Sequence, residues 1–141
     1  MEIFDNSTAL TPEKGFLVIR ASTAGGIIPL EGAAVSIRGE APENSGIIYS
    51  TTTNSDGLTE KIALPTPPKM LSEDPKGARP YSVYNIDVFK DGYIPVYFNN
   101  VPVFSNVISI QPAIMVPASN AEWQLLSNTP IVYNEYENPE L

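Results

Sequence analysis

Fourteen prolines in 141 residues constrain this chain more than any other feature of its sequence. They occur along the whole length, at about twice the average usage. Because proline lacks a backbone N–H and its ring blocks helix interiors, such a chain favours strands and turns. No stretch carries the apolar period of a long amphipathic helix. The sequence therefore predicts an all-β fold.

Short runs rich in β-branched and aromatic residues alternate with clusters of Gly, Pro, Asn and Asp, a pattern typical of β-sandwiches. In the longest run, Tyr84, Ile86 and Val88 are predicted to face inward, and Asn85 and Asp87 outward. We expect a seven-stranded antiparallel Greek-key β-sandwich. Its strands are predicted at residues 16–22, 33–38, 47–53, 58–64, 81–89, 93–98 and 107–116.

The segment Asn54–Gly57 separates the runs 47–53 and 58–64. Its Asp-Gly pair supplies the positive φ angle of a tight turn, so we expect the two runs to form a hairpin. The same segment contains a fragment of a calcium-loop pattern, but the remaining oxygen ligands and the closing glutamate are missing. We interpret it as a plain turn.

The first and last runs also have defined faces. Leu17, Ile19 and Ala21 share one face of the first run. In the last run, the isoleucines at 108, 110 and 114 share one parity with Val116. Pro112 requires this run to be an edge strand or to contain a bulge.

Sixteen acidic residues against eight basic ones give a net charge of −8, which argues against nucleic-acid binding. The chain has no Cys and no His, which excludes zinc fingers, disulfides, a cysteine nucleophile and a Ser-His-Asp triad. Catalysis would have to use a carboxylate pair such as Glu60 and Asp87, and nothing in the sequence brings these two together. We therefore expect a protein that is not an enzyme and uses no cofactor or metal.

Charge also divides the chain, because residues 122–141 contain four acids and no base. We predict an N-terminal extension (1–14), a sandwich (15–117) and an acidic C-terminal extension (118–141). The first residues lack a signal-peptide pattern, and there is no apolar run of membrane-spanning length. We expect synthesis in the cytoplasm without a Sec signal, and no membrane insertion.

Several segments carry a resemblance to a known family. Gly15–Ile19, Ile28–Ile37 with its P-x-x-G-A-x-V pattern, and the Thr53–Gly57 turn resemble the carboxypeptidase regulatory-like, or transthyretin-like, β-sandwich family. Pro80–Val88 and Asn100–Phe104 are similar to the small sandwich domains of clostridial spore-cortex-lytic and peptidoglycan-binding proteins. The resemblance implies a transthyretin-like fold and a non-catalytic role in folding, adhesion or assembly.

Two segments contain candidate interaction residues. The connector Pro65–Pro80 carries three of the eight bases, and the C-terminal extension is acidic yet rich in apolar side chains. An extended apolar segment can pair with an open sheet edge, either on its own sandwich or on a neighbouring copy. The candidate residues are Lys69, Lys76, Arg79, Trp123, Ile131, Tyr133 and Tyr136.

We therefore expect a homo-oligomeric structural subunit of a bacterial surface, spore or phage particle, whose terminal extensions dock onto neighbouring copies. The alternative is a glycan- or peptidoglycan-binding accessory module that works with a separate cell-wall hydrolase. For that alternative, Tyr49, Tyr97 and Phe98 are the candidate aromatic platform.

Overall fold

The computed structural model describes residues 13–39, 46–67, 81–118 and 130–134. These ranges contain nine strands and one short 3-10 turn, and no α-helix occurs within them. The elements are β1 (Glu13–Thr23), η1 (Ala24–Gly26), β2 (Ile28–Pro29), β3 (Ala34–Gly39), β4 (Ile47–Thr52), β5 (Ile62–Thr66), β6 (Tyr81–Phe89), β7 (Val96–Phe104), β8 (Ile108–Ile114) and β9 (Ile131–Asn134).

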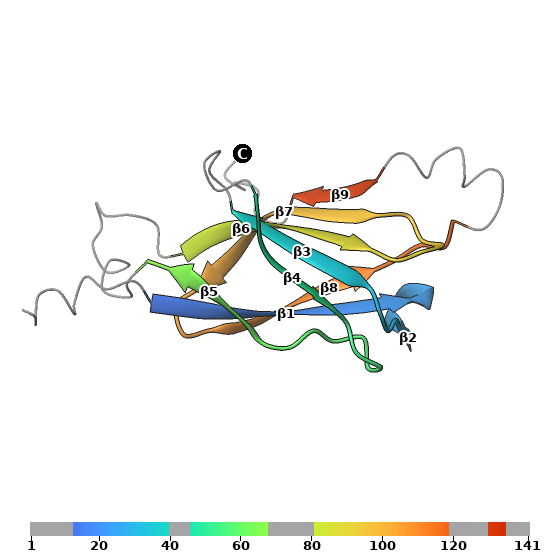
Figure 1. Ribbon diagram of the computed structural model, residues 1–141, viewed down its shortest axis with the longest axis horizontal. Helices are drawn as coiled ribbons and strands as arrows, with labels where there is room; N and C mark the ends of the chain where they lie inside the picture. The colour runs from blue at the N-terminus through green and yellow to red at the C-terminus, as the bar shows by residue number, and fades with distance from the viewer. Residues whose placement is uncertain (1–12, 40–45, 68–80, 119–129, 135–141) are drawn as a thin grey trace, which may run out of the picture.

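The strands form two mixed sheets that pack as a sandwich (Figure 1). In sheet A, β2 and β5 lie on one side of β1, and β8 lies on the other. Sheet B has the order β4-β3-β6-β7-β9. The expected all-β sandwich is confirmed, but β1 and β8 pair in parallel where an antiparallel sandwich was predicted. β9, which lies outside the predicted strands, also pairs in parallel, with β7.

The inner faces of the two sheets form one apolar core. Leu17, Ile19 and Ala21 on β1 are fully buried, which confirms that they share one face of this strand and shows that this face is the inner one. The predicted inward face of β6 is also confirmed, because its three side chains at 84, 86 and 88 are buried. Other large side chains with at most 1% exposure are Val35, Ile37, Ile62, Val96, Val103 and Met115.

The predicted hairpin between residues 47–53 and 58–64 is wrong, because β4 belongs to sheet B and β5 to sheet A. The turn itself forms: Gly57 has φ +79° and its N–H donates to the Asn54 carbonyl at 2.8 Å. Its two arms bind different sheets. Thr53 Oγ1 accepts the Ala33 N–H at 2.9 Å, and Thr59 Oγ1 accepts the Ile19 N–H at 3.0 Å. The turn therefore carries the chain across the sandwich.

The strand predicted at 93–98 is displaced, since β7 begins at Val96 and continues to Phe104. The Asn-Asn pair at 99–100 has turn-forming composition, yet it lies inside the strand. Asn100 adopts φ +62° and donates its N–H to Asn85 Oδ1 at 3.0 Å, where the β6/β7 register shifts. Asn tolerates this left-handed conformation, so the strand continues through a bulge.

The last predicted strand corresponds to β8, which pairs only with β1 among the described strands. Pro112 thus lies in an edge strand, one of the two alternatives predicted for it. The isoleucines that share one parity point away from the core, whereas Ala113 and Met115 are buried. The apolar row of this strand is therefore on the outer surface.

The segment boundaries differ in detail from those expected. β1 begins at Glu13, two residues before the predicted start of the sandwich, and β9 lies inside the predicted C-terminal extension. Pro65 and Thr66, placed in the connector, belong to β5. The rest of the connector from residue 68 to 80 lies outside the described residues.

Candidate interaction surfaces

The strand β9 adds to the edge of sheet B in parallel with β7. The Ile131 N–H donates to the Pro95 carbonyl at 2.9 Å, and the Ile131 side chain packs against the core. The Tyr133 ring stacks on the Phe98 ring with centroids 5.3 Å apart and an interplanar angle of 15°. Strand addition by β9 therefore combines backbone hydrogen bonds with two inward side chains.

The chain reaches β9 from a point nearby on the same sheet edge. The Ala118 N–H donates to the Gly92 carbonyl at 2.7 Å, and the next described contact is that of Ile131 with Pro95. Eleven residues, 119–129, lie outside the described ranges between these two points. Extended, such a segment spans at most roughly 40 Å. The extended length of residues 119–129 therefore exceeds the distance between the two contact points, Gly92 and Pro95, which are only three residues apart in the sequence.

The other edge of sheet B is β4, which pairs only with β3 in the part of the chain that the structure describes. Residues 47–52 contain neither a proline nor a charged side chain. Ile47 and Ile48 are 53% and 47% exposed. Edge strands are commonly protected by Lys, Pro or a bulge, and within residues 47–52 the only such feature is the β3/β4 register shift at Ile37 and Arg38. Among the described residues, no strand pairs with the outer side of β4.

Both edges of sheet A carry a proline whose imide nitrogen points outward. On β8, hydrogen bonds of Phe16 N–H to the Val107 carbonyl (2.9 Å) and Met115 N–H to the Ser22 carbonyl (2.7 Å) place the odd-numbered amides toward β1. Pro112, at an even position, therefore faces the free edge.

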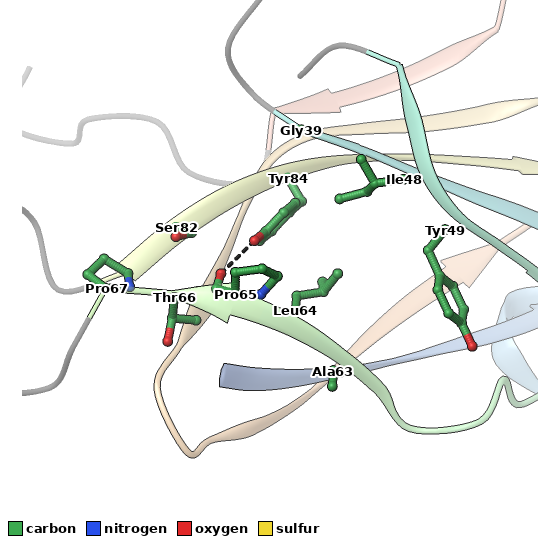
Figure 2. A pocket seen from close by; sticks show the side chains of 10 residues that line it. All are labelled: Gly39, Ile48, Tyr49, Ala63, Leu64, Pro65, Thr66, Pro67, Ser82 and Tyr84. Carbon is green, nitrogen blue, oxygen red and sulfur yellow. Dashed lines mark hydrogen bonds between the residues drawn. The ribbon is translucent and has the colours of Figure 1, made fainter. Parts of the chain in front are cut away.

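On β5, the Pro65 carbonyl accepts the Tyr84 hydroxyl at 2.5 Å, across the sandwich and not toward β1 (Figure 2). The nitrogen and oxygen of one residue point the same way in an antiparallel ladder, so the Pro65 nitrogen also faces the free edge. Sheet A is thus poorly suited to strand addition on either side.

Glu60 and Asp87, the carboxylates considered for acid–base chemistry, have separate partners. Asp87 Oδ2 accepts Arg38 Nε at 2.9 Å on the outer side of sheet B. Glu60 accepts the hydroxyls of Tyr49 and, at 2.8 Å, Thr51. The Tyr49 hydrogen bond, a backbone hydrogen bond and the Thr51 hydrogen bond hold the pKa of Glu60 below its usual value. The same pair raises the pKa of Tyr49, since the Glu60 carboxylate favours the protonated phenol.

A cavity of about 670 Å³ opens between β5 of sheet A and the ends of β3, β4 and β6 (Figure 2). Burial is the main cause that raises the pKa of Tyr84, which lines it. Thr66 Oγ1 is buried there without a hydrogen-bond partner in the described part of the chain. None of the described residues that line the cavity is an acid or a base. The lining residues are Gly39, Ile48, Tyr49, Ala63, Leu64, Pro65, Thr66, Pro67, Ser82 and Tyr84.

Two undescribed segments, 40–45 and 68–80, join the chain at Gly39 and Pro67 on the rim of this cavity. We therefore assign it no ligand. Within the described residues there is also no cluster of three or more potential metal ligands. In the same ranges, no helix has the length and apolar character needed to cross a membrane.

The structure describes two of the seven residues predicted for interaction, Ile131 and Tyr133, and both contact sheet B. The other five lie outside the described residues: Lys69, Lys76, Arg79, Trp123 and Tyr136.

Among the candidate platform aromatics, only Tyr97 is on an outward face. Phe98 is 3% exposed and belongs to the core, so its proposed surface role is wrong. Tyr49 faces the cavity and Glu60.

Neither a protein-family model nor a curated protein matches the chain. Solved structures of similar fold include catechol 1,2-dioxygenase from Acinetobacter sp. ADP1, which is 13% identical with a TM-score of 0.53 and aligns with 86% of this chain and 59% of that one. 3-Chlorocatechol 1,2-dioxygenase from Rhodococcus opacus 1CP is 9% identical with a TM-score of 0.50, and the alignment covers 77% of this chain and 61% of that one. A chain of a type II cohesin–X-dockerin complex from Acetivibrio cellulolyticus is 16% identical with a TM-score of 0.46, and the alignment covers 76% of this chain and 60% of that one.

The alignments thus span about three fifths of each of those chains. At these identities the likeness to the dioxygenases concerns the fold alone, and it supports the two-layer β architecture. It gives no support to the narrower carboxypeptidase regulatory-like assignment. The chain is therefore a β-sandwich, and its function has to be inferred from its surfaces because no family assignment supplies it.

Proposed function

We propose that this chain is a non-catalytic assembly subunit that associates with copies of itself through its C-terminal strand. The observation that carries the proposal is the addition of β9 to the edge of sheet B. Because an extended 119–129 segment reaches roughly 40 Å, β9 can add to β7 of a neighbouring copy as well as to its own. Exchange of an identical element is a low-cost route to assembly, since the contacts are the same in both arrangements.

The size of the β9 contact suits exchange. The strand has four residues, and Val132 and Tyr133 are still 49% and 45% exposed. Elements with little buried area open at low free-energy cost, so β9 can leave one edge and occupy another. The resemblance to sandwich domains of cell-wall and spore proteins leads us to place the assembly in a bacterial surface, spore or phage particle.

Paired cysteines test the exchange directly, because the chain has no native Cys. Tyr97 and Val132 are direct partners in the β7/β9 register. Two single variants, Tyr97→Cys and Val132→Cys, are mixed and oxidised. We expect a disulfide-linked heterodimer on a non-reducing gel, because the cross-link requires β9 of one copy on β7 of the other. A mixture of Val132→Cys with Glu31→Cys, at an exposed turn, is the control.

The solution mass gives the second test. Sedimentation velocity of the full chain should give an oligomer, and a chain ending at Pro130 should give a smaller species. A monomeric full chain, together with no heterodimer in the cysteine mixture, would contradict the assembly function.

A glycan-binding role is the second candidate, and aromatic pairs on the outer side of sheet B favour it. Phe89 and Tyr97 have ring centroids 6.0 Å apart in an edge-on arrangement, and Tyr81 and Phe104 are 5.3 Å apart. Phe89 and Phe104 are 39% and 36% exposed. This role predicts that the protein sediments with purified cell-wall sacculi, and that Phe89→Ala and Tyr97→Ala together abolish retention.

A further inference from the structure

The outer face of sheet A carries a contiguous apolar row. In the parallel register of β1 and β8, Phe16 lies beside Ile108 and Val18 beside Ile110. Ile108 and Ile110 are 57% and 58% exposed, and Ile114 farther along β8 is 44% exposed. Monomeric soluble proteins rarely expose contiguous apolar patches larger than a few hundred Å², and larger patches mark interaction sites.

Three basic side chains accompany this row. Lys14 and Arg20 occupy the outward parity of β1, the same as Phe16 and Val18. Lys61 Nζ lies 4.8 Å from the centroid of the Phe16 ring, in a cation–π arrangement. No acid occupies an outward position of β1, β5 or β8 as the structure describes them. The face is therefore basic, although the chain as a whole has a net charge of −8.

The two edge prolines bear on how a partner can bind here. Pro65 and Pro112 remove amide donors from the free sides of β5 and β8, so a partner gains little from backbone pairing at these edges. The exposed isoleucines lie on the outer face of edge strand β8, beside Phe16 and Val18 of β1. A partner is therefore expected to lie across the face and to bind through side chains.

Charge selects the chemistry of that partner. Packing the face on itself would bring six bases together, which opposes a face-to-face dimer. An acidic segment with apolar side chains is complementary to it. Residues 135–141, directly after β9, have this composition, with glutamates at 135, 137 and 140, together with Tyr136 and Leu141, and no base. We propose that the outer face of sheet A binds residues 135–141 of a second copy; this proposal rests on the assembly function proposed above.

A second copy is a better source of this segment than the same chain. β9 ends at the far edge of sheet B, in the layer opposite sheet A (Figure 1). Seven residues extend over about 25 Å at most, and part of that length would be used in passing round the edge of the sandwich. A neighbouring copy can present the segment without this detour.

Charge exchange in the full chain tests the contact. The face variant carries Lys14→Glu, Arg20→Glu and Lys61→Glu, and the tail variant carries Glu135→Lys, Glu137→Lys and Glu140→Lys. Each variant alone has like charges on face and tail, whereas a mixture of the two restores opposite charges at every contact between unlike copies. In sedimentation at low salt, we expect each variant to associate roughly tenfold or more weakly than the original chain, and the mixture to recover most of the loss.

The possible results separate this contact from strand exchange. Unchanged association of both variants would overturn the contact, and so would weakened association without recovery in the mixture. In either case a persistent 97–132 heterodimer would leave the assembly function standing. Flotation of the original chain with phosphatidylcholine–phosphatidylserine vesicles, lost in the face variant, would also overturn the proposal, since it would identify a lipid surface as the partner. Circular dichroism checks that both variants remain folded.

Discussion

The two sheets of this sandwich share one core but offer different parts of themselves for contact. Sheet A has a proline at each outer edge and exposes an apolar, basic face. Sheet B extends one edge with β9 and leaves the other, β4, without proline or charge. On the outer side of sheet B, Arg38 pairs with Asp87, and two separate aromatic pairs form, Tyr81 with Phe104 and Phe89 with Tyr97. Sheet A is thus suited to contacts across its face, and sheet B to contacts along its edges.

This difference shows that the orientation of a proline matters more than its presence. Pro65 and Pro112 lie inside strands without breaking them, because each replaces an amide that faces away from β1. The same substitution at an inward amide would remove a ladder hydrogen bond. Each proline therefore leaves sheet A intact and makes its edge a poor template for another strand.

The largest expected effect is on the free energy of unfolding, and it compares an apolar residue of the core with one on the outer face of sheet A. Ile86→Ala in the core should lower the free energy of unfolding by about 2–5 kcal/mol, because it removes buried contacts and leaves a cavity. Ile110→Ala on the outer face of sheet A should change it by less than about 0.5 kcal/mol. Urea unfolding of both variants measures the difference. Similar losses would contradict the assignment of Ile110 to an exposed surface.

The next largest effect on stability is expected at the Asn54–Gly57 turn, where the chain passes from sheet B to sheet A. A Cβ at Gly57 would lie 2.4 Å from the Ala21 carbonyl oxygen, at a residue with φ +79°. Gly57→Ala should therefore cost about 3 kcal/mol from the combined backbone strain and clash. Gly92→Ala is the matched control, since φ is +86° there but the space around it is open; we expect about 1 kcal/mol. Equal thermal shifts for the two would contradict a close crossing at Gly57.

A third variant removes the proline from one edge of sheet A, so that this edge, like β4 of sheet B, contains no proline. Pro112→Thr adds an outward amide and a β-branched side chain to β8, with a change in stability below about 1 kcal/mol. We expect concentration-dependent self-association to increase, as measured by light scattering. The substitution Gln111→Thr changes the neighbouring residue without altering the outward amide and should have no such effect. If Pro112→Thr associates no more than this control, the proline does not protect the edge.

Local alternation was enough to group the buried side chains of two strands. It placed three residues of β1 on one face and predicted the inward face of β6, and all of these side chains are buried. Their opposite faces are not purely polar, because β1 carries Phe16 and Val18 there. Alternation failed to indicate the role of β8, whose large apolar residues face outward while the buried positions hold Ala113 and Met115.

Sheet assignment depended on contacts that a local pattern does not contain. The turn at Asn54–Gly57 was predicted, but the hydroxyls of Thr53 and Thr59 bind backbone amides 20 and 40 residues away and send the two arms to different sheets. Similarly, the left-handed Asn100 is supported by Asn85 from the neighbouring strand. For the candidate surfaces, the sequence predicted strand addition by the C-terminal segment, but the outward direction of the edge prolines required the register.

The smallest expected effect concerns the Glu60 contact, which joins the turn between the sheets to edge strand β4. The pKa of Glu60 is lowered in the folded state, chiefly by the Tyr49 hydroxyl, so ionised Glu60 contributes stability above pH 4.5. This contribution should be lost as pH falls through the folded-state pKa. Because Glu60 is almost fully exposed, solvent screening limits it to about 0.5 kcal/mol or less.

Unfolding of the original chain and of Glu60→Gln, measured from pH 7 to pH 3, should therefore converge as the solution becomes acidic. Tyr49→Phe keeps the carboxylate but removes its main hydrogen-bond donor, and we expect it to reduce the same pH dependence. The two variants remove the two partners of one contact, Glu60 in the connection between the sheets and Tyr49 on β4, so they should behave alike. Parallel curves for all three proteins over this range would mean that the Glu60 contact does not stabilise β4.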